Sequence, residues 1–334
     1  MANIVFPYMD LPENAQKEVL RTLDHNDLFA FSTLSRKSRN LVASLNIPAI
    51  NLKVEVWDRL ITIQMTFHEN RYLNLEFNLA NSNTLNRKYV IFSNKLYTTW
   101  RDPGINFREL IINLCSIFLF ALPSNLMIWS GNEAIETEEI RDYFSGVLGY
   151  LTVFYQNSEE FTQKILRRCL PASKKLILYR DTPLQGPIWF RHVAIQNLDA
   201  LHLDHPISLN DLLICNSFII DAVHNQIAQK TINRFFRSWI KGSNRRLEYV
   251  GFSLAEAEAA NVNTLFKGIT YQFIPNTVER VVKKHIFENM STDPEWRINL
   301  VTGGFEINNK WGTSVTVILR RVYGRSNICM FVWN

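Results

Sequence analysis

The segment from Phe6 to Leu45 reads FPYMDLPENAQKEVLRTLDHNDLFAFSTLSRKSRNLVASL. Its apolar side chains recur at helical spacing between polar breaks, and this pattern predicts three short helices. Asp10 is placed to cap the first helix, with Glu13 three residues later as in a capping box, and Pro12 lies where a missing N–H group costs nothing. A unit of about 40 residues rarely buries enough apolar surface to fold alone. We therefore expect it to pack on the rest of the chain or on another protein.

Each predicted helix has one apolar face. The apolar positions are Ala15, Val19, Leu20 and Leu23 in the first helix, Leu28, Phe31 and Leu34 in the second, and Leu41, Val42 and Leu45 in the third. The third segment begins at Ser35 and is ended by Pro48. Taken alone, the pattern also fits the first three helices of a larger domain.

The same residues resemble the F-box, a three-helix unit that docks onto a Skp-family adaptor and through it joins a cullin ubiquitin ligase. The resemblance rests on Leu11-Pro12, Val19-Leu20, Leu23-Asp24, Asp27-Leu28, Leu34-Ser35-Arg36 and Arg39-x-Leu41, and the lead-in from Phe6 is similar to that of the expanded nematode F-box families. One departure is Ser38, near which many F-boxes have Trp. The resemblance implies that the adaptor is bound by Leu11, Pro12, Val19, Leu20, Leu23, Leu28, Phe31 and Leu34. Some of these side chains must also form the core of the unit, and sequence does not separate the two sets.

The composition is that of an ordinary folded protein with one to three domains. The chain has 334 residues, of which 47% are hydrophobic and 20% charged. Its formal net charge of +5 is a mild excess. The Lys and Arg residues are scattered, so the charge does not indicate a nucleic-acid partner.

The cysteines and the apolar runs favour a cytoplasmic or nuclear protein. Cys115, Cys169, Cys215 and Cys329 are far apart, without the paired spacing of a zinc site or the density of a disulfide framework. No secretory signal pattern opens the chain. The longest apolar run, Leu110–Leu122, contains Asn113 and is too short to span a bilayer. We expect a buried helix there and no membrane association.

The middle of the chain predicts a mixed α/β region over residues 51–185. Apolar and polar residues alternate over 50–57 and 73–79, which is typical of a sheet with one buried face and one solvent-exposed face. Further predicted elements are strands at 89–92, 96–97, 126–129 and 176–179 and helices within 104–122 and 158–170. Strands that alternate with helices indicate repeated α/β units.

The C-terminal half shows degenerate leucine-rich-repeat spacing. Leu198, Leu201 and Leu203 fit the L-x-x-L-x-L template, residues 247–252 repeat it with Val and Phe, and residues 218–222 form a strand between them. A helix follows from the stripe of Ile232, Phe235, Phe236, Trp239 and Ile240, with Lys230, Arg234, Arg237 and Lys241 on its other face and Gly242 as its C-terminal cap. Such a stripe is typical of a core helix.

This stretch resembles the signature of the nematode F-box-associated domain of type 2. The matching residues are Thr231-Ile232-Asn233-Arg234-Phe235-Phe236, Trp239-Ile240-Lys241-Gly242-Ser243-Asn244 and Leu247-Glu248. Arg245 replaces the usual Pro, and Phe236 replaces the usual Leu. The tail, with predicted strands at 304–307, 315–317 and 328–333, is similar to these families more loosely.

The two resemblances imply an α+β fold: a three-helix F-box at 5–50, a mixed α/β linker region at 51–185 packed on both neighbours, and an F-box-associated domain at 186–334 with its core signature at 191–252. They imply a substrate receptor of a Skp–cullin–F-box ubiquitin ligase, whose C-terminal domain binds a protein target. The receptor performs no bond chemistry itself.

The sequence contains no catalytic or metal-binding motif that argues against a substrate receptor. His202-Leu203-Asp204-His205 is a conceivable metal or acid/base cluster, but His202 is equally a strand residue that alternates outward before a turn at Pro206. No nucleophile elbow, Walker loop, H-E-x-x-H or dinucleotide fingerprint occurs. We predict no catalytic residue, no cofactor and no metal. Three alternatives stay open: an interaction scaffold without ligase association, because of Ser38; a nucleic-acid-binding protein, because of the pI near 9.0 and the basic helix face; and an enzyme of unknown type.

Overall fold

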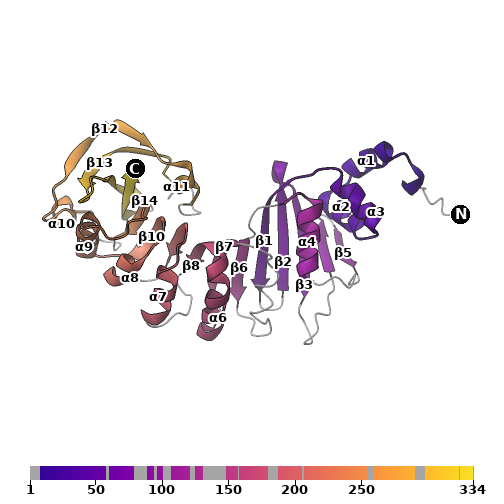
Figure 1. Ribbon diagram of the computed structural model, residues 1–334, viewed down its shortest axis with the longest axis horizontal. Coiled ribbons are helices and arrows are strands. Elements are labelled where there is room, and N and C mark those ends of the chain that lie inside the picture. Colours follow the sequence, from indigo (N-terminus) through magenta and orange to yellow (C-terminus); the bar gives the residue numbers. More distant parts are fainter. Residues whose placement is uncertain are drawn as a thin grey trace. The chain divides into compact units, whose positions relative to one another are not determined.

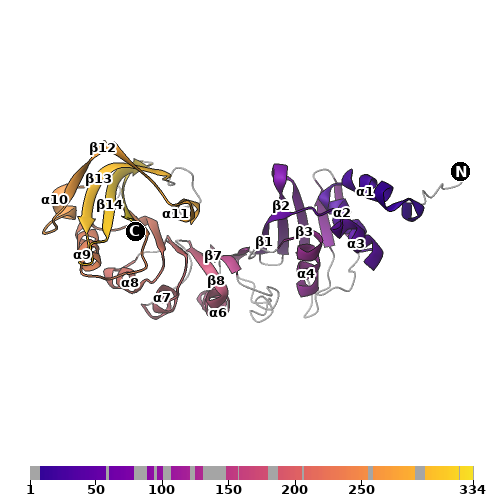
Figure 2. The ribbon, with the colours of Figure 1, turned by 45° about the horizontal axis from the view of Figure 1, so that its top comes forward.

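The structure is a computed structural model that forms two compact units, Met1–Gly149 and Tyr150–Asn334 (Figures 1 and 2). It describes residues 8–57, 60–78, 89–93, 96–100, 107–120, 125–130, 148–156, 158–179, 187–204, 207–254, 259–289, 298–322 and 324–333. Helices and strands are both abundant, and the predicted α+β class is confirmed. The finer division at residues 50 and 185 stays a prediction.

The first unit opens with the three predicted helices. They are α1 (Glu13–Arg21), α2 (His25–Ser32) and α3 (Arg36–Ala43), preceded by a 3-10 turn, η1 (Tyr8–Asp10). The expected cap at Asp10 is wrong, because this residue ends η1 and Pro12 holds the N-cap position of α1. The Gln16 side chain instead donates to the carbonyl oxygens of Met9 and Leu11, at 3.1 and 2.8 Å, and ties η1 to the helix.

Side-chain caps fix where the other two helices begin. The Asp24 carboxylate accepts a hydrogen bond from the Asp27 backbone N–H at 2.8 Å. Helix α2 therefore begins at His25, directly after this cap, and Asp27 lies within its first turn. Ser35 and Ser38 form a capping box at the start of α3, as each side chain bonds the backbone of the other.

A sheet follows the helices in the first unit. Its strands are β1 (Ala49–Trp57), β2 (Leu60–Phe67), β3 (Tyr72–Asn78), β4 (Tyr89–Ser93), β5 (Leu96–Trp100) and β6 (Asn125–Ser130), in the order β6-β1-β2-β3-β4-β5. Leu52, Val54 and Val56 are buried at every second position of β1, as the alternation predicts. Helix α4 (Phe107–Ile117) lies along this sheet (Figure 1). Strand β2 was not predicted.

The small helical unit packs on this sheet and on α4. The ring of His25 stacks on Phe67 of β2 with centroids 3.8 Å apart. The Asn74 N–H donates to Asn26 Oδ1 at 3.3 Å, and Arg39 Nη1 donates to Asn113 Oδ1 of α4 at 3.1 Å. The three helices therefore pack on the rest of the first unit, which is one of the two packing partners expected from the sequence.

Successive strand–helix units build most of the second unit. They comprise β7 (Leu148–Gln156), α6 (Glu159–Cys169), η3 (Leu170–Ala172), β8 (Ser173–Leu178), α7 (Pro187–Ala194), β9 (Ala200–Leu203), α8 (Leu209–Ile214), β10 (Ile219–Gln226), α9 (Gln229–Ile240) and β11 (Tyr249–Ser253). Strands β8 to β11 are parallel neighbours, with Leu201 paired to Leu176 and to Ile220. Helices α6 to α9 follow one another along the sheet (Figure 1). The predicted repeat-like α/β units are confirmed.

The remaining strands of the second unit pair in antiparallel fashion. The remaining elements are α10 (Val262–Leu265), β12 (Gln272–Val281), α11 (Lys284–Asn289), β13 (Leu300–Asn308), β14 (Ser314–Val322) and β15 (Arg325–Trp333). Strand β15 pairs antiparallel with β11, opposing Met330 to Val250. Strands β12, β13 and β14 lie side by side (Figure 2). The three tail strands were predicted, whereas β12 was not.

Helix α9 carries the core of this unit. Ile232, Phe235 and Phe236 are each 0% exposed, and Phe235 meets Phe252 of β11 edge to face at 5.5 Å between centroids. The four basic residues predicted for the outer face of this helix region are exposed; they are Lys230, Arg234, Arg237 and Lys241. The prediction of a core helix is confirmed.

Candidate functional site

The eight side chains expected to bind an adaptor range from fully buried to largely exposed. Leu20 and Leu28 are each 1% exposed and belong to the core of the first unit. Val19 is 39% exposed, Leu34 is 73% exposed, and Pro12 is also exposed. The remaining three are half-buried; they are Leu11, Leu23 and Phe31. Burial thus separates a scaffolding set from a set that is free to contact another protein.

The exposed residues lie where the helices begin or end. Leu34 follows the last turn of α2 and is held by a 3.2 Å hydrogen bond from its N–H to the Phe31 carbonyl oxygen. Val19 points away from the core because α1 buries Gln16 and Leu20 instead. Met9, which sequence reasoning missed, adds a further apolar side chain that is 39% exposed.

The lead-in to α1 is fixed by a residue that the sequence did not single out. The Tyr8 ring meets Phe31 edge to face, with centroids 5.3 Å apart, and its hydroxyl donates to the Gln16 carbonyl oxygen at 2.9 Å. Together with the Gln16 side chain, these contacts hold η1 against α1 and α2. Leu11 and Pro12 are therefore presented in a defined position.

Ser38 has a structural role of its own in α3. It is 1% exposed, its hydroxyl donates to the Ser35 carbonyl oxygen at 2.9 Å, and it accepts from the Ser35 N–H at 2.8 Å. An indole at this position could not accept the hydrogen bond from the Ser35 N–H, and it is much larger than the buried hydroxymethyl group that it would replace. Ser38 is therefore part of the local packing and capping of the third helix in this chain.

The loop between α9 and β11, residues 241–248, is called the signature loop here. Its hydrogen bonds end α9 and connect the loop to α8. The Gly242 N–H bonds the Trp239 carbonyl oxygen at 2.8 Å and the Ser243 N–H bonds that of Ser238 at 3.1 Å, which is a Schellman motif with Gly242 at a φ of +106°. The predicted cap is confirmed. Asn244, at a φ of +49°, donates to the carbonyl oxygens of Leu212 and Cys215 at 2.8 and 2.9 Å.

The histidine cluster does not assemble a metal site in the described part of the chain. His202 Nδ1 lies 3.3 Å from a carboxylate oxygen of Asp221, a side chain that is 2% exposed. No group of three or more metal-ligating side chains occurs among the residues with described positions. His205, which completes the sequence cluster, lies outside them.

Three of the four thiols, those of Cys115, Cys215 and Cys329, are poorly suited to nucleophilic chemistry. Burial raises the pKa of Cys115 and of Cys329 to about 11, and that of Cys215 to about 12. Among the helices that the structure describes, none is long and apolar enough to cross a membrane.

Comparison with known proteins matches two segments of the chain to two families. The profile of the F-box domain matches residues 9–49, and that of the F-box associated family matches residues 189–252. Both are families of interaction domains. The chain is also similar to the F-box associated domain-containing protein sdz-33 of Caenorhabditis elegans, with 25% identity over 277 residues that cover 81% of this chain and 87% of that protein. No solved structure matches the chain significantly. The two resemblances drawn from the sequence are confirmed.

Proposed function

We propose that this chain, which joins an N-terminal F-box to a C-terminal F-box-associated domain, is the substrate receptor of a Skp–cullin–F-box ubiquitin ligase. Its first unit would hold the Skp-family adaptor and through it a cullin, and its second unit would capture a protein target. The observation that carries this proposal is the F-box match at 9–49, in which apolar side chains stay exposed on a fixed helical framework.

The exposed set supplies the adaptor contacts in this proposal. Leu34, Val19, Pro12 and the half-buried Leu11 present apolar surface that association would remove from water, at roughly 25 cal/mol per Å². Buried anchors usually dominate such interfaces. Leu20 and Leu28 contribute indirectly, because they hold the helices that carry the contact residues.

A second candidate function is an interaction scaffold that no longer binds the adaptor. The observation that favours it is Ser38, which is buried in a capping box where many F-boxes have Trp. The scaffold would bind its protein target through the second unit but would not co-purify with the adaptor.

Coexpression with a Skp-family adaptor, followed by size-exclusion chromatography, separates the two candidates. The receptor function predicts a stoichiometric complex, and the double variant Leu11→Ala, Pro12→Ala should elute apart from the adaptor while keeping its folded circular-dichroism spectrum. A monomeric wild-type chain that ignores the adaptor would reject the receptor function. A double variant that still co-elutes would reject the assigned surface.

A further inference from the structure

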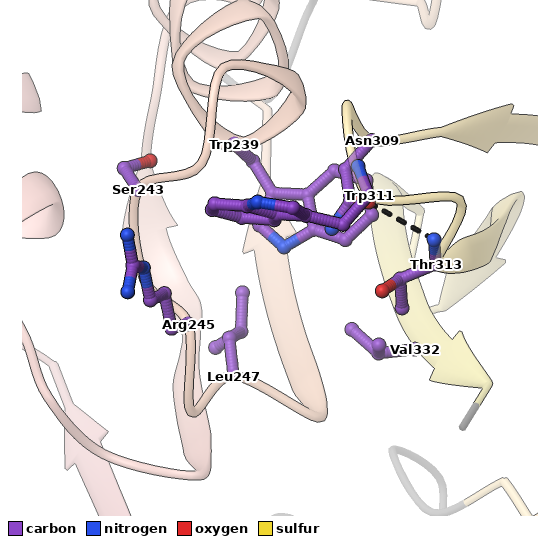
Figure 3. A pocket seen from close by; sticks show the side chains of 8 residues that line it. All are labelled: Trp239, Ser243, Arg245, Leu247, Asn309, Trp311, Thr313 and Val332. Carbon is purple, nitrogen blue, oxygen red and sulfur yellow. Dashed lines mark hydrogen bonds between the residues drawn. The ribbon is translucent and has the colours of Figure 1, made fainter.

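A cavity opens in the second unit where the signature loop meets the turn between β13 and β14 (Figure 3). Its volume is about 330 Å³. The lining residues come from the end of α9, the signature loop, this turn and β15; they are Trp239, Ser243, Arg245, Leu247, Asn309, Trp311, Thr313 and Val332. Neither family resemblance assigns a ligand to this place.

The floor of the cavity is apolar and one wall is an exposed aromatic ring. Leu247 is 2% exposed, and Trp239 and Val332 are each 3% exposed, so these three side chains form the buried, apolar part of the lining. Trp311 is 50% exposed and extends across the cavity in Figure 3. A partly exposed indole beside an apolar recess is well suited to receive an aliphatic or aromatic side chain.

Two cations lie over the rings of Trp311, one from the cavity lining and one from the neighbouring residue of the turn. The guanidinium carbon of Arg245 lies 4.9 Å from the centroid of a Trp311 ring, and Lys310 Nζ lies 4.5 Å from one. Both cations are exposed, neither forms an ion pair with a described residue, and no lining residue is acidic. The recess therefore combines apolar contact with an unmatched positive charge.

The site is preorganised. Asn309 Oδ1 accepts hydrogen bonds from the N–H groups of Trp311 and Thr313, both at 2.9 Å. The Lys310 N–H bonds the Ile240 carbonyl oxygen at 3.0 Å and ties the turn to the end of α9. A partner that binds here does not have to order the turn first, which favours affinity.

We propose that this cavity binds an acidic segment of the target protein. An apolar side chain of that segment would enter the recess beside Trp311, and a neighbouring Asp or Glu carboxylate would face Arg245 and Lys310. Arg245 is suited to the carboxylate because its guanidinium offers paired N–H donors. The inference rests on the proposed receptor function and specifies its substrate class.

The test uses a random peptide library displayed on phage and panned on the full chain, alone and with the adaptor. Enriched peptides should carry Asp or Glu next to a large apolar residue. One enriched peptide is then synthesised with a fluorescent label, and its affinity for each protein is measured by fluorescence anisotropy. Arg245→Glu and Trp311→Ala should each bind it roughly tenfold more weakly than wild type. Its affinity for the wild-type chain should fall as the salt concentration is raised. Arg234→Glu is the matched control, because it reverses an exposed charge on α9 outside the cavity lining.

Several results would overturn the inference. They are enrichment of basic or neutral peptides, no enrichment at all, equal effects of Arg245→Glu and Arg234→Glu, or an RNA oligonucleotide that displaces the peptide. Adaptor co-elution is measured on the same samples. Retained co-elution without acidic-peptide binding rejects only the cavity assignment, whereas peptide binding without co-elution rejects only the ligase role.

Discussion

The indole ring of Trp311 lies against Gly242, in the space that a side chain at residue 242 would occupy. A Cβ atom built on Gly242 would stand within 2.9 Å of three atoms of that ring. Gly242 also has a φ of +106°, which side chains rarely tolerate. One signature glycine therefore both ends α9 and lets the turn between β13 and β14 close over the loop.

The Gly242→Ala variant should be destabilised by both effects. Backbone strain alone costs about 1–3 kcal/mol, and overlap with Trp311 adds to it. In a Trp311→Ala background the overlap is absent, so the same change should cost less. Urea unfolding of the four proteins in a double-mutant cycle measures the difference. An equal cost of Gly242→Ala in both backgrounds would show that the two residues do not contact each other.

Asn244 is expected to stabilise the loop through its side chain as well as its backbone. It donates to two carbonyl oxygens at the end of α8 and has a φ of +49°. Asn244→Gly keeps the backbone freedom and loses the hydrogen bonds, which costs about 1–3 kcal/mol for buried groups. Asn244→Ala loses both and should be the less stable variant in urea unfolding. If Asn244→Gly is as stable as wild type, the two side-chain hydrogen bonds do not stabilise the loop.

Restoring the residue common in F-boxes should harm this chain. Ser38→Ala should cost about 1 kcal/mol, because the Ser35 N–H loses the hydroxyl that accepts its hydrogen bond in the capping box. Ser38→Trp should cost about 1–3 kcal/mol more, because the site is 1% exposed and cannot hold an indole without shifts. Thermal unfolding of the two variants beside wild type provides the measurement. A stabilised Ser38→Trp protein would mean that α3 packs differently.

His25 makes stability depend on pH. Its burial, reinforced by the nearby Arg71 charge and opposed by Asp24, lowers its pKa below the ordinary 6.5. The unfolded chain then binds the proton more readily than the folded one. The stabilising contribution is complete above about pH 6.5 and is lost as pH falls through that value toward the lowered folded pKa.

The matched variant is His25→Phe, which keeps a ring against Phe67 and cannot be protonated. Between about pH 7.5 and 5.5 the melting temperature of wild type should fall further than that of the variant. Equal losses would show that His25 is not the group responsible.

The sequence predicted elements whose patterns are local. The α9 stripe could be recognised because Ile232, Phe235 and Phe236 fill one buried face. The β2 strand was missed although its buried residues alternate, whereas β12 offers no such signal: it is largely exposed, contains Pro275, and leaves Phe273 61% exposed. An apolar pattern reports strands only where the sheet has a buried face.

The candidate adaptor-binding surface and the cavity could not be located from the sequence, because both depend on tertiary packing. Val19 and Leu20 are neighbouring apolar residues, and only packing makes one 39% and the other 1% exposed. Trp311 lies far along the chain from Gly242, and no local pattern connects them. The one available sequence signal for the cavity is Arg245, a charged residue in place of the usual Pro.

The most direct test of the central claim is the affinity of the Leu34→Asp variant for a Skp-family adaptor, measured by isothermal titration calorimetry. Leu34 is 73% exposed, so this change should leave the melting temperature unaltered. Ile195→Asp is the matched control, since Ile195 is 58% exposed and lies in the second unit. We predict that Leu34→Asp weakens adaptor binding by at least about tenfold and that Ile195→Asp has no effect. Unchanged affinity of Leu34→Asp would contradict the assignment of the exposed helical surface as the adaptor-docking site.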